Sequence, residues 1–242
     1  MSGHSKWATI KRQKEKTDIK KGLTFTKLAN AIIIAVKKGG GITDPNQNFR
    51  LRLAIDAARA SNMPKENIER AIQRAGKKEG GDIQEVIYEG FTPGGVSVII
   101  EAATDNPQRT TVEIKRIFNK AGASFGQPGS VSYQFEKMGK ITIEKNGKSF
   151  DEIFSIAAES GAEDIEEEDG SVSIFTKAQE LSKLREKLLK KGLNIRDAGL
   201  YRKPNVEMPI SDPEQLNKVK NFLDTVNNLD DVQNVYSNLA ES

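Results

Sequence analysis

The hydrophobic pattern of this chain changes its period near Gly80, and this change limits the architectures that the chain can adopt. Between residues 23 and 76, apolar side chains recur at helical spacing in three short segments. Beyond Gly80, apolar and polar residues alternate, as in half-buried β-strands. We therefore predict an α+β multidomain protein whose first domain is a small three-helix bundle.

Residues 140–203 show the clearest order of elements. Strand-like segments at 140–144, 162–168 and 171–175 and around Ile195 alternate with two helical segments. The first helical segment begins with Ser149-Phe150-Asp151-Glu152, which matches a capping box. The resulting order, βαββαβ, is that of a ferredoxin-like unit.

The flanking segments predict a second α/β unit. Residues 96–135 and 205–238 each have the order strand, helix, strand, with strands expected at 131–135 and 206–210. An isolated βαβ segment buries too little surface to be stable, so we expect the two to pair into a second ferredoxin-like unit, with the strand at 83–91 as an addition. The alternative is two half-domains that never meet. The predicted domains are residues 1–78, residues 79–135 with 205–242, and an inserted domain of residues 136–204.

Charge is distributed very unevenly. Residues 1–78 contain 18 Lys and Arg against 6 Asp and Glu, whereas residues 79–242 contain 19 against 28. A cationic segment without compensating carboxylates favours a polyanionic partner, and nucleic acid is the commonest one. The candidate phosphate-binding residues are Lys6, Lys11, Arg12, Lys14, Lys16, Lys20 and Lys21 in a basic arm, and Arg50, Arg52, Arg59, Lys65, Arg70 and Arg74 in the bundle. Trp7 either stacks on a base or, more in keeping with its neighbours, fastens the arm to the first helix.

The composition argues against an enzyme. The chain has no cysteine and a single histidine, His4, so a histidine-dependent triad or a thiolate metal site cannot be assembled. The acidic run at residues 163–169 offers magnesium ligands, but a solvated hairpin edge explains it better. No apolar run resembles a signal peptide or a membrane span. We expect a cytoplasmic, non-enzymatic protein without metal, cofactor, membrane or small-molecule partner; its oligomeric state is left open.

A second candidate surface is the loop at residues 104–110, which contains Arg109. Its polar side chains precede a predicted helix, where unpaired amides attract anions. Helix capping alone would explain Thr104 and Asp105. The loop at residues 126–130 belongs to the same predicted domain and is expected nearby.

Several motifs resemble the YebC-type family, which includes mitochondrial translational activators of cytochrome oxidase. The opening Met1-Ser2-Gly3-His4-Ser5-Lys6-Trp7 is the first of them. The others are Asn62-Met63-Pro64-Lys65, Tyr88-Glu89-Gly90 with Pro93-Gly94-Gly95-Val96, Thr104-Asp105-Asn106 with Arg109-Thr110, and Gly129-Ser130-Val131 before Tyr133. The chain departs from the family pattern at Pro107, Gln108, Phe125 and Tyr133, where a basic residue, Asn, Leu and Trp are usual.

The resemblance implies three domains and a non-enzymatic regulator of gene expression. Bacterial members are described as probable DNA-binding transcriptional regulators, whereas other relatives act in translation. Two hypotheses therefore stay open: a DNA-binding transcriptional regulator, and a translation factor that binds ribosomal or transfer RNA on the ribosome. The connection at residues 39–48 is too long for the tight turn of a helix-turn-helix, which disfavours reading of a DNA groove.

Overall fold

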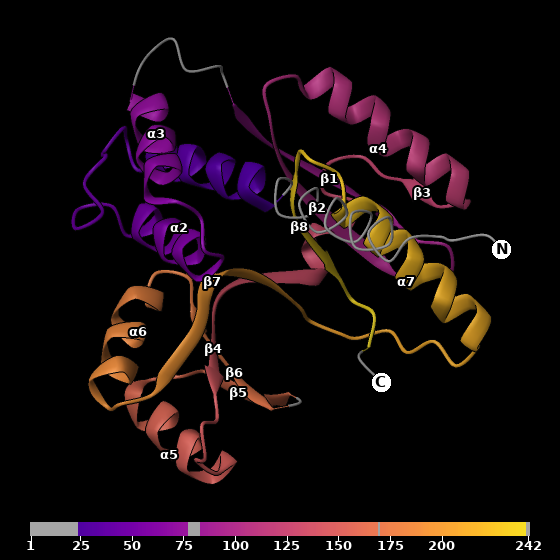
Figure 1. Cartoon of the computed structure of the whole chain (residues 1–242). Helices are drawn as coiled ribbons and strands as arrows, with labels where there is room; N and C mark the ends of the chain where they lie inside the picture. Colours follow the sequence, from indigo (N-terminus) through magenta and orange to yellow (C-terminus); the bar gives the residue numbers. More distant parts are fainter. Residues whose placement is uncertain (1–23, 77–82, 169, 241–242) are drawn as a thin grey trace, which may run out of the picture.

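The structure is a computed structural model that describes residues 24–76, 83–168 and 170–240 (Figure 1). The bundle contains a helix over residues 24–38, α2 (Phe49–Ala60) and α3 (Lys65–Gly76), as the sequence pattern predicts. Its core is formed by Ile32, Val36, Leu51, Ile55, Met63 and Ile68. Asn48 begins α2 by accepting from the amide of Leu51, and its own side chain donates to the carbonyls of Ala35 and Ile42, both at 3.0 Å.

The first sheet contains β1 (Gln84–Phe91), β2 (Ser97–Thr104), β3 (Ser124–Phe125) and β8 (Val232–Ser237) in the order β3-β1-β2-β8. All of its strands are antiparallel. Helices α4 (Pro107–Ala121) and α7 (Pro213–Asn227) pack on one face through a buried apolar cluster. Within it, the rings of Phe118 and Phe222 meet edge to face at 4.9 Å.

The second sheet follows the predicted βαββαβ order. Its elements are β4 (Phe135–Glu144), α5 (Phe150–Ser160), β5 (Asp164–Glu168), β6 (Ser171–Lys177), α6 (Leu181–Lys190) and β7 (Asn194–Pro204). The strands lie in the order β5-β6-β4-β7 and are antiparallel throughout. The capping box at Ser149 and Glu152 is present, as predicted. This part of the chain therefore has the ferredoxin-like arrangement.

The prediction of a second ferredoxin-like unit is wrong about two of its strands, at residues 131–135 and 206–210. Residues 132–134 form a 3₁₀ turn, η1, and Phe135 already belongs to the second sheet. Residues 206–210 contribute only an isolated bridge from Met208 to Leu239, and Pro209 removes one backbone donor from this segment. The place left in the sheet is taken by β1, which pairs with β2 across a tight turn and is not an addition. The limits of the predicted domains stay a prediction.

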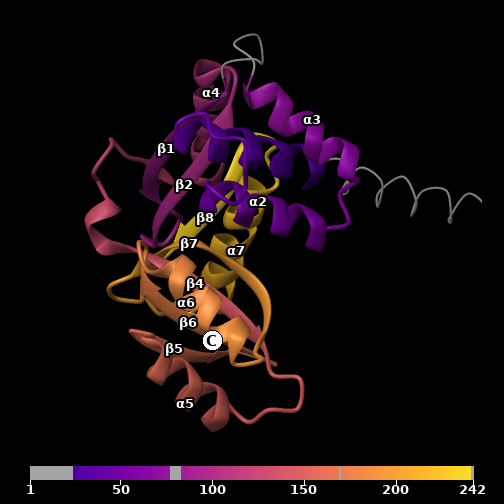
Figure 2. The same ribbon diagram turned by 90° about the vertical axis from the view of Figure 1, so that its left-hand side faces the viewer.

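Strand β2 is buried on both faces. It lies between helices α4 and α7 on one side and the first helix of the bundle and the second sheet on the other (Figure 2). Val98, Ile100 and Ala102 face α4 and α7. On the other face, Ala103 packs against Ile33 of the first helix, whereas Ile99 packs in a cluster that includes Phe135 and Tyr201 of the second sheet. In both views α4 and α5 lie at opposite ends of the molecule. Within the described ranges, no helix is both long and apolar enough to cross a lipid bilayer.

Candidate nucleic-acid interface

Of the predicted phosphate-binding residues, those of the arm lie outside the described residues. They are Lys6, Trp7, Lys11, Arg12, Lys14, Lys16, Lys20 and Lys21. The geometry therefore bears on the six cations of the bundle and on Arg109.

Helix α3 presents its cations to solvent. Ile68 and Ala71 are buried against the other two helices, which leaves Arg70 and Arg74 exposed on the opposite side. These two arginines are four residues apart and so share one face. Lys65 lies at the start of the helix and is 3.5 Å from Glu69, with 87% of its side chain exposed, so the pair is weak and readily exchanged.

Helix α2 divides its three arginines between two roles. Arg50 and Arg59 are exposed, and Arg59 is 4.0 Å from Asp56. Arg52 instead lies over the ring of Phe49 and 3.9 Å from Glu186 of α6, with its Nε buried and without a partner. A second ion pair joins the same two helices, since Nη2 of Arg185 in α6 lies 2.7 Å from Oδ2 of Asp56 in α2. Arg52 is therefore part of the contact between the bundle and the second sheet.

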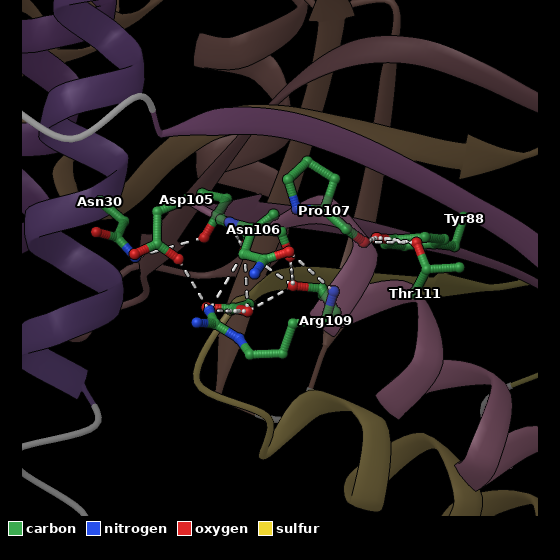
Figure 3. A network of polar contacts seen from close by, with 11 residues as sticks. Asn30, Tyr88, Asp105, Asn106, Pro107, Arg109 and Thr111 are labelled. Carbon is green, nitrogen blue, oxygen red and sulfur yellow. Dashed lines mark hydrogen bonds and ion pairs between the residues drawn. The ribbon is translucent and has the colours of Figure 1, made fainter.

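Arg109 lies at the start of α4, and two carboxylates surround its guanidinium (Figure 3). Its Nη2 donates to Asp231 at 2.9 Å and to Asp105 at 3.0 Å. The hydrogen bond and the negative charge of Asp231 raise the pKa of Arg109 further. Because two negative charges already compensate this cation, the loop does not offer a phosphate a net positive site.

Asp231 is the centre of this network. It accepts from the hydroxyls of Thr110 at 2.6 Å and Thr104 at 3.1 Å. Burial disfavours the charge of Asp231, but the hydrogen bonds from Thr110, Arg109 and Thr104 outweigh it and lower its pKa. The network therefore fixes the start of α4 to the start of β8.

Asn106, within the segment Thr104-Asp105-Asn106 that precedes the helix, caps α4. Asn106 accepts from the amide of Arg109 at 3.1 Å, whereas Thr104 accepts from the amide of Asn106 at 3.0 Å. On the other side of the loop, the side chain of Asn30 donates to the carbonyl of Ala103 at 3.5 Å (Figure 3). The side chains of Thr104, Asp105, Asn106, Arg109 and Thr110 are thus engaged in contacts within the protein.

We expect Arg109→Met to change the affinity for nucleic acid by less than about twofold, because its guanidinium is engaged by Asp105 and Asp231 and is not free to contact a phosphate. Arg74→Met, which removes an exposed cation of α3, should weaken binding by about threefold or more. Fluorescence anisotropy with a labelled duplex and a labelled RNA hairpin at fixed salt measures both. An equal loss in the two variants would contradict this assignment.

Sequence reasoning missed Glu89, which holds the loop at residues 126–132. This carboxylate, 6% exposed, accepts from the backbone amides of Gly129, Val131 and Ser132 at 2.8–2.9 Å. Burial alone would raise the pKa of Glu89, but the three amide bonds outweigh burial and lower it. The sequence marked Glu89 only as part of the motif Tyr88-Glu89-Gly90 and as a carboxylate in the middle of a predicted strand, neither of which indicates its role.

The acidic run at residues 163–169 does not form a cation site in the part that the structure describes. Lys203 donates to Asp164 and, at 2.6 Å, to Glu166. Elsewhere in the described ranges, no three histidine or carboxylate side chains converge as metal ligands would.

Comparisons with known proteins agree along the whole chain. The family model of the TACO1/YebC protein N-terminal domain matches residues 5–78, and that of the TACO1/YebC second and third domain matches residues 83–239. A probable transcriptional regulatory protein of Thermoanaerobacter pseudethanolicus is 46% identical over 241 residues, covering 99% of this chain and 97% of the relative. A protein of the same description from a Sulfurihydrogenibium species is 48% identical over 240 residues, covering 98% and 95%.

A solved structure extends the likeness to three dimensions. The crystal structure of a conserved hypothetical protein from Aquifex aeolicus matches with a TM-score of 0.86 and 42% sequence identity, over 90% of both chains. Together with the two family models, these matches confirm the resemblance seen in the sequence motifs. The chain belongs to the TACO1/YebC family.

Proposed function

We propose that this protein is a non-enzymatic regulator of gene expression that binds nucleic acid through the exposed cations of its bundle and through the basic arm of residues 1–21. The main support is the unpaired face of α3: Arg70 and Arg74 form no ion pair with any described residue. Flexible cations of this kind follow a phosphate backbone without demanding a base sequence. The names of the relatives, probable transcriptional regulatory proteins, support a regulatory role.

One feature of the bundle supports DNA as the first candidate partner. Helices α2 and α3 are separated only by residues 61–64, and Asn62 in this turn adopts the left-handed backbone conformation, with φ of 57°. A connection of three to four residues is typical of helix-turn-helix units, whose second helix enters the major groove. The connection at residues 39–48, by contrast, is too long for this purpose.

The second candidate partner is ribosomal or transfer RNA in translation. Phosphate contacts made by lysine and arginine carry no base specificity and so suit RNA as well as DNA. The exposed ring of Tyr133 adds a surface on which an unpaired base can stack. For both candidates, the affinity for nucleic acid should fall as the salt concentration rises. If about six phosphates are neutralised, the slope of log affinity against log salt is near −5 on duplex DNA and near −4 on single strands.

The test is the charge-reversal variant Arg70→Glu/Arg74→Glu. We expect it to weaken binding by about tenfold to hundredfold and to flatten the salt slope by about 2, because two phosphate contacts are lost and two repulsions are added. Fluorescence anisotropy with a duplex, a DNA single strand and an RNA hairpin, each over a salt series, measures both quantities.

The matched control is Lys183→Glu/Lys190→Glu, which makes the same change of charge on exposed positions of α6. An equal loss in the control and in the α3 variant would remove α3 from the interface. Failure of the unmodified protein to bind any of the three probes at low salt would overturn the proposed function itself.

A further inference from the structure

The two most exposed large apolar side chains of the described residues lie together. Val206 is 74% exposed and Tyr133 is 72% exposed. Both line one hollow of about 480 Å³, beside the segments that connect the first sheet to the second. Single exposed apolar side chains need no explanation, but this adjacent pair lines a hollow and offers a ligand an apolar surface.

The backbone that carries Tyr133 is held firmly. Tyr133 lies in η1, directly after the loop that Glu89 fixes through three amide bonds. The side chain of Asn205 donates to the carbonyl of Tyr133 at 3.2 Å. Its position is therefore set by contacts that leave the aromatic ring in solvent.

The ring itself is also oriented without being covered. The side chain of Gln134 donates to the hydroxyl of Tyr133 at 3.2 Å and accepts from the hydroxyl of Ser97 at 2.9 Å. An exposed ring held in this way adds little to the stability of the fold, since it buries little apolar surface. It offers a ligand a flat surface that loses little conformational entropy on binding.

The lining of the hollow indicates the chemistry of its ligand. Beside the ring lie the apolar side chains of Val206, Met208 and Pro209. Carboxamide side chains complete it: Gln134, Asn205 and Asn238, each of which also forms a hydrogen bond within the protein. The exposed ring of Tyr133 is the group best suited to a ligand here, since aromatic faces stack on unpaired bases. Glu207 supplies the only charge among the lining residues, so the hollow suits an uncharged base and not a phosphate.

We propose that this hollow, which we call the Tyr133 hollow, binds an unpaired nucleobase that stacks on the ring of Tyr133. The inference rests on the proposed function and extends it: in addition to the phosphate contacts, which a duplex also provides, the protein gains affinity from a nucleic acid that contains a single-stranded stretch. Both RNA and an opened DNA duplex supply such a base. A continuous duplex does not, because its bases are stacked on one another and are not free to enter the hollow.

The test compares Tyr133→Ala with the unmodified full-length protein on three labelled probes: an RNA single strand, a DNA single strand of the same base sequence, and the corresponding DNA duplex. We expect Tyr133→Ala to weaken binding to at least one single strand by about 5- to 150-fold, as one lost stacking contact does, and to leave duplex binding unchanged. Tyr133→Phe should retain single-strand affinity within about threefold, because it keeps the ring.

Val112→Ala is the control, since Val112 is 69% exposed on α4 and lies outside the hollow. A loss confined to RNA or to DNA assigns the source of the base. Unchanged single-strand affinity in Tyr133→Ala overturns the inference, as does an equal loss on the duplex. Retained affinity in Tyr133→Ala together with weakened binding in Arg70→Glu/Arg74→Glu would leave the proposed function standing without the hollow.

Discussion

Replacing Arg202 by leucine is expected to lower the free energy of unfolding by about 3 kcal/mol, because it leaves the carboxylate of Glu101, whose side chain is only 19% exposed, without its cation. Arg202 is 6% exposed, and its Nε donates to Glu101 at 2.7 Å. Glu101 belongs to β2 of the first sheet, and Arg202 belongs to β7 of the second. This ion pair therefore links the first sheet to the second.

The remaining partners of Glu101 cannot replace the lost cation. The side chains of Asn234 and Tyr236 donate to its Oε2 at 3.3 and 3.4 Å, which are long hydrogen bonds. Burial and the negative charge of Glu101 raise the pKa of the Tyr236 phenol, so this group stays a neutral donor. Neutral donors at these distances compensate a partly buried charge only in part.

Urea unfolding of the single variants Arg202→Leu and Glu101→Leu and of the double variant measures this effect. The double variant should be more stable than Arg202→Leu, because it removes the orphaned charge as well as the pair. A loss below about 1 kcal/mol in Arg202→Leu would show that water reaches Glu101 and that the pair behaves as a surface salt bridge.

The sequence predicted those parts of the fold that short-range patterns determine. The helices of the bundle and the βαββαβ order of the second sheet follow from apolar periodicity and from caps such as Ser149 with Glu152. The partners of the strands in the first sheet depend on contacts far apart in sequence. The alternation of apolar and polar residues at 131–135 predicted one strand. Val131 and Phe135 are indeed both buried, but a 3₁₀ turn lies between them and Phe135 is the first residue of β4.

The candidate site was predictable in charge but not in the pairing of its charges. A count of cations treats Arg74 and Arg109 alike, although the first is exposed without a described partner and the second has two carboxylates. Asp231, which makes the difference, is 122 residues away from Arg109 in the chain. The exposure of Tyr133 and the burial of Glu89 depend on the same kind of long-range contact, so neither carried a clear signal in the sequence.

Replacing Glu89 by glutamine is expected to destabilise the fold by about 3 kcal/mol at neutral pH. A carboxylate accepts from the amides of Gly129, Val131 and Ser132 with both oxygens. Glutamine has one acceptor oxygen, and its NH₂ group would face at least one of these backbone donors. A buried amide would then lack an acceptor, and the turn that carries Tyr133 would loosen.

This effect should depend on pH in one direction. Hydrogen bonds hold the pKa of Glu89 in the folded protein below its ordinary value of about 4.3, so the carboxylate stabilises the fold at any pH above that value. As the pH falls through the lowered pKa, Glu89 takes up a proton and the stabilisation is lost. The difference in unfolding free energy between the unmodified protein and Glu89→Gln should therefore be full at neutral pH and shrink in acid.

Urea unfolding over a series of pH values measures this difference, and Glu85→Gln on the same strand is the control. Glu85 is exposed, and its salt bridge is a 3.1 Å contact with the exposed Lys38, so its loss should cost less than about 1 kcal/mol. A difference for Glu89→Gln that stays constant from neutral to acid pH would mean that the charge of Glu89 does not stabilise the loop. The orientation of Tyr133 would then depend on Asn205 and Gln134 alone, and single-strand binding in Glu89→Gln would match that of the unmodified protein.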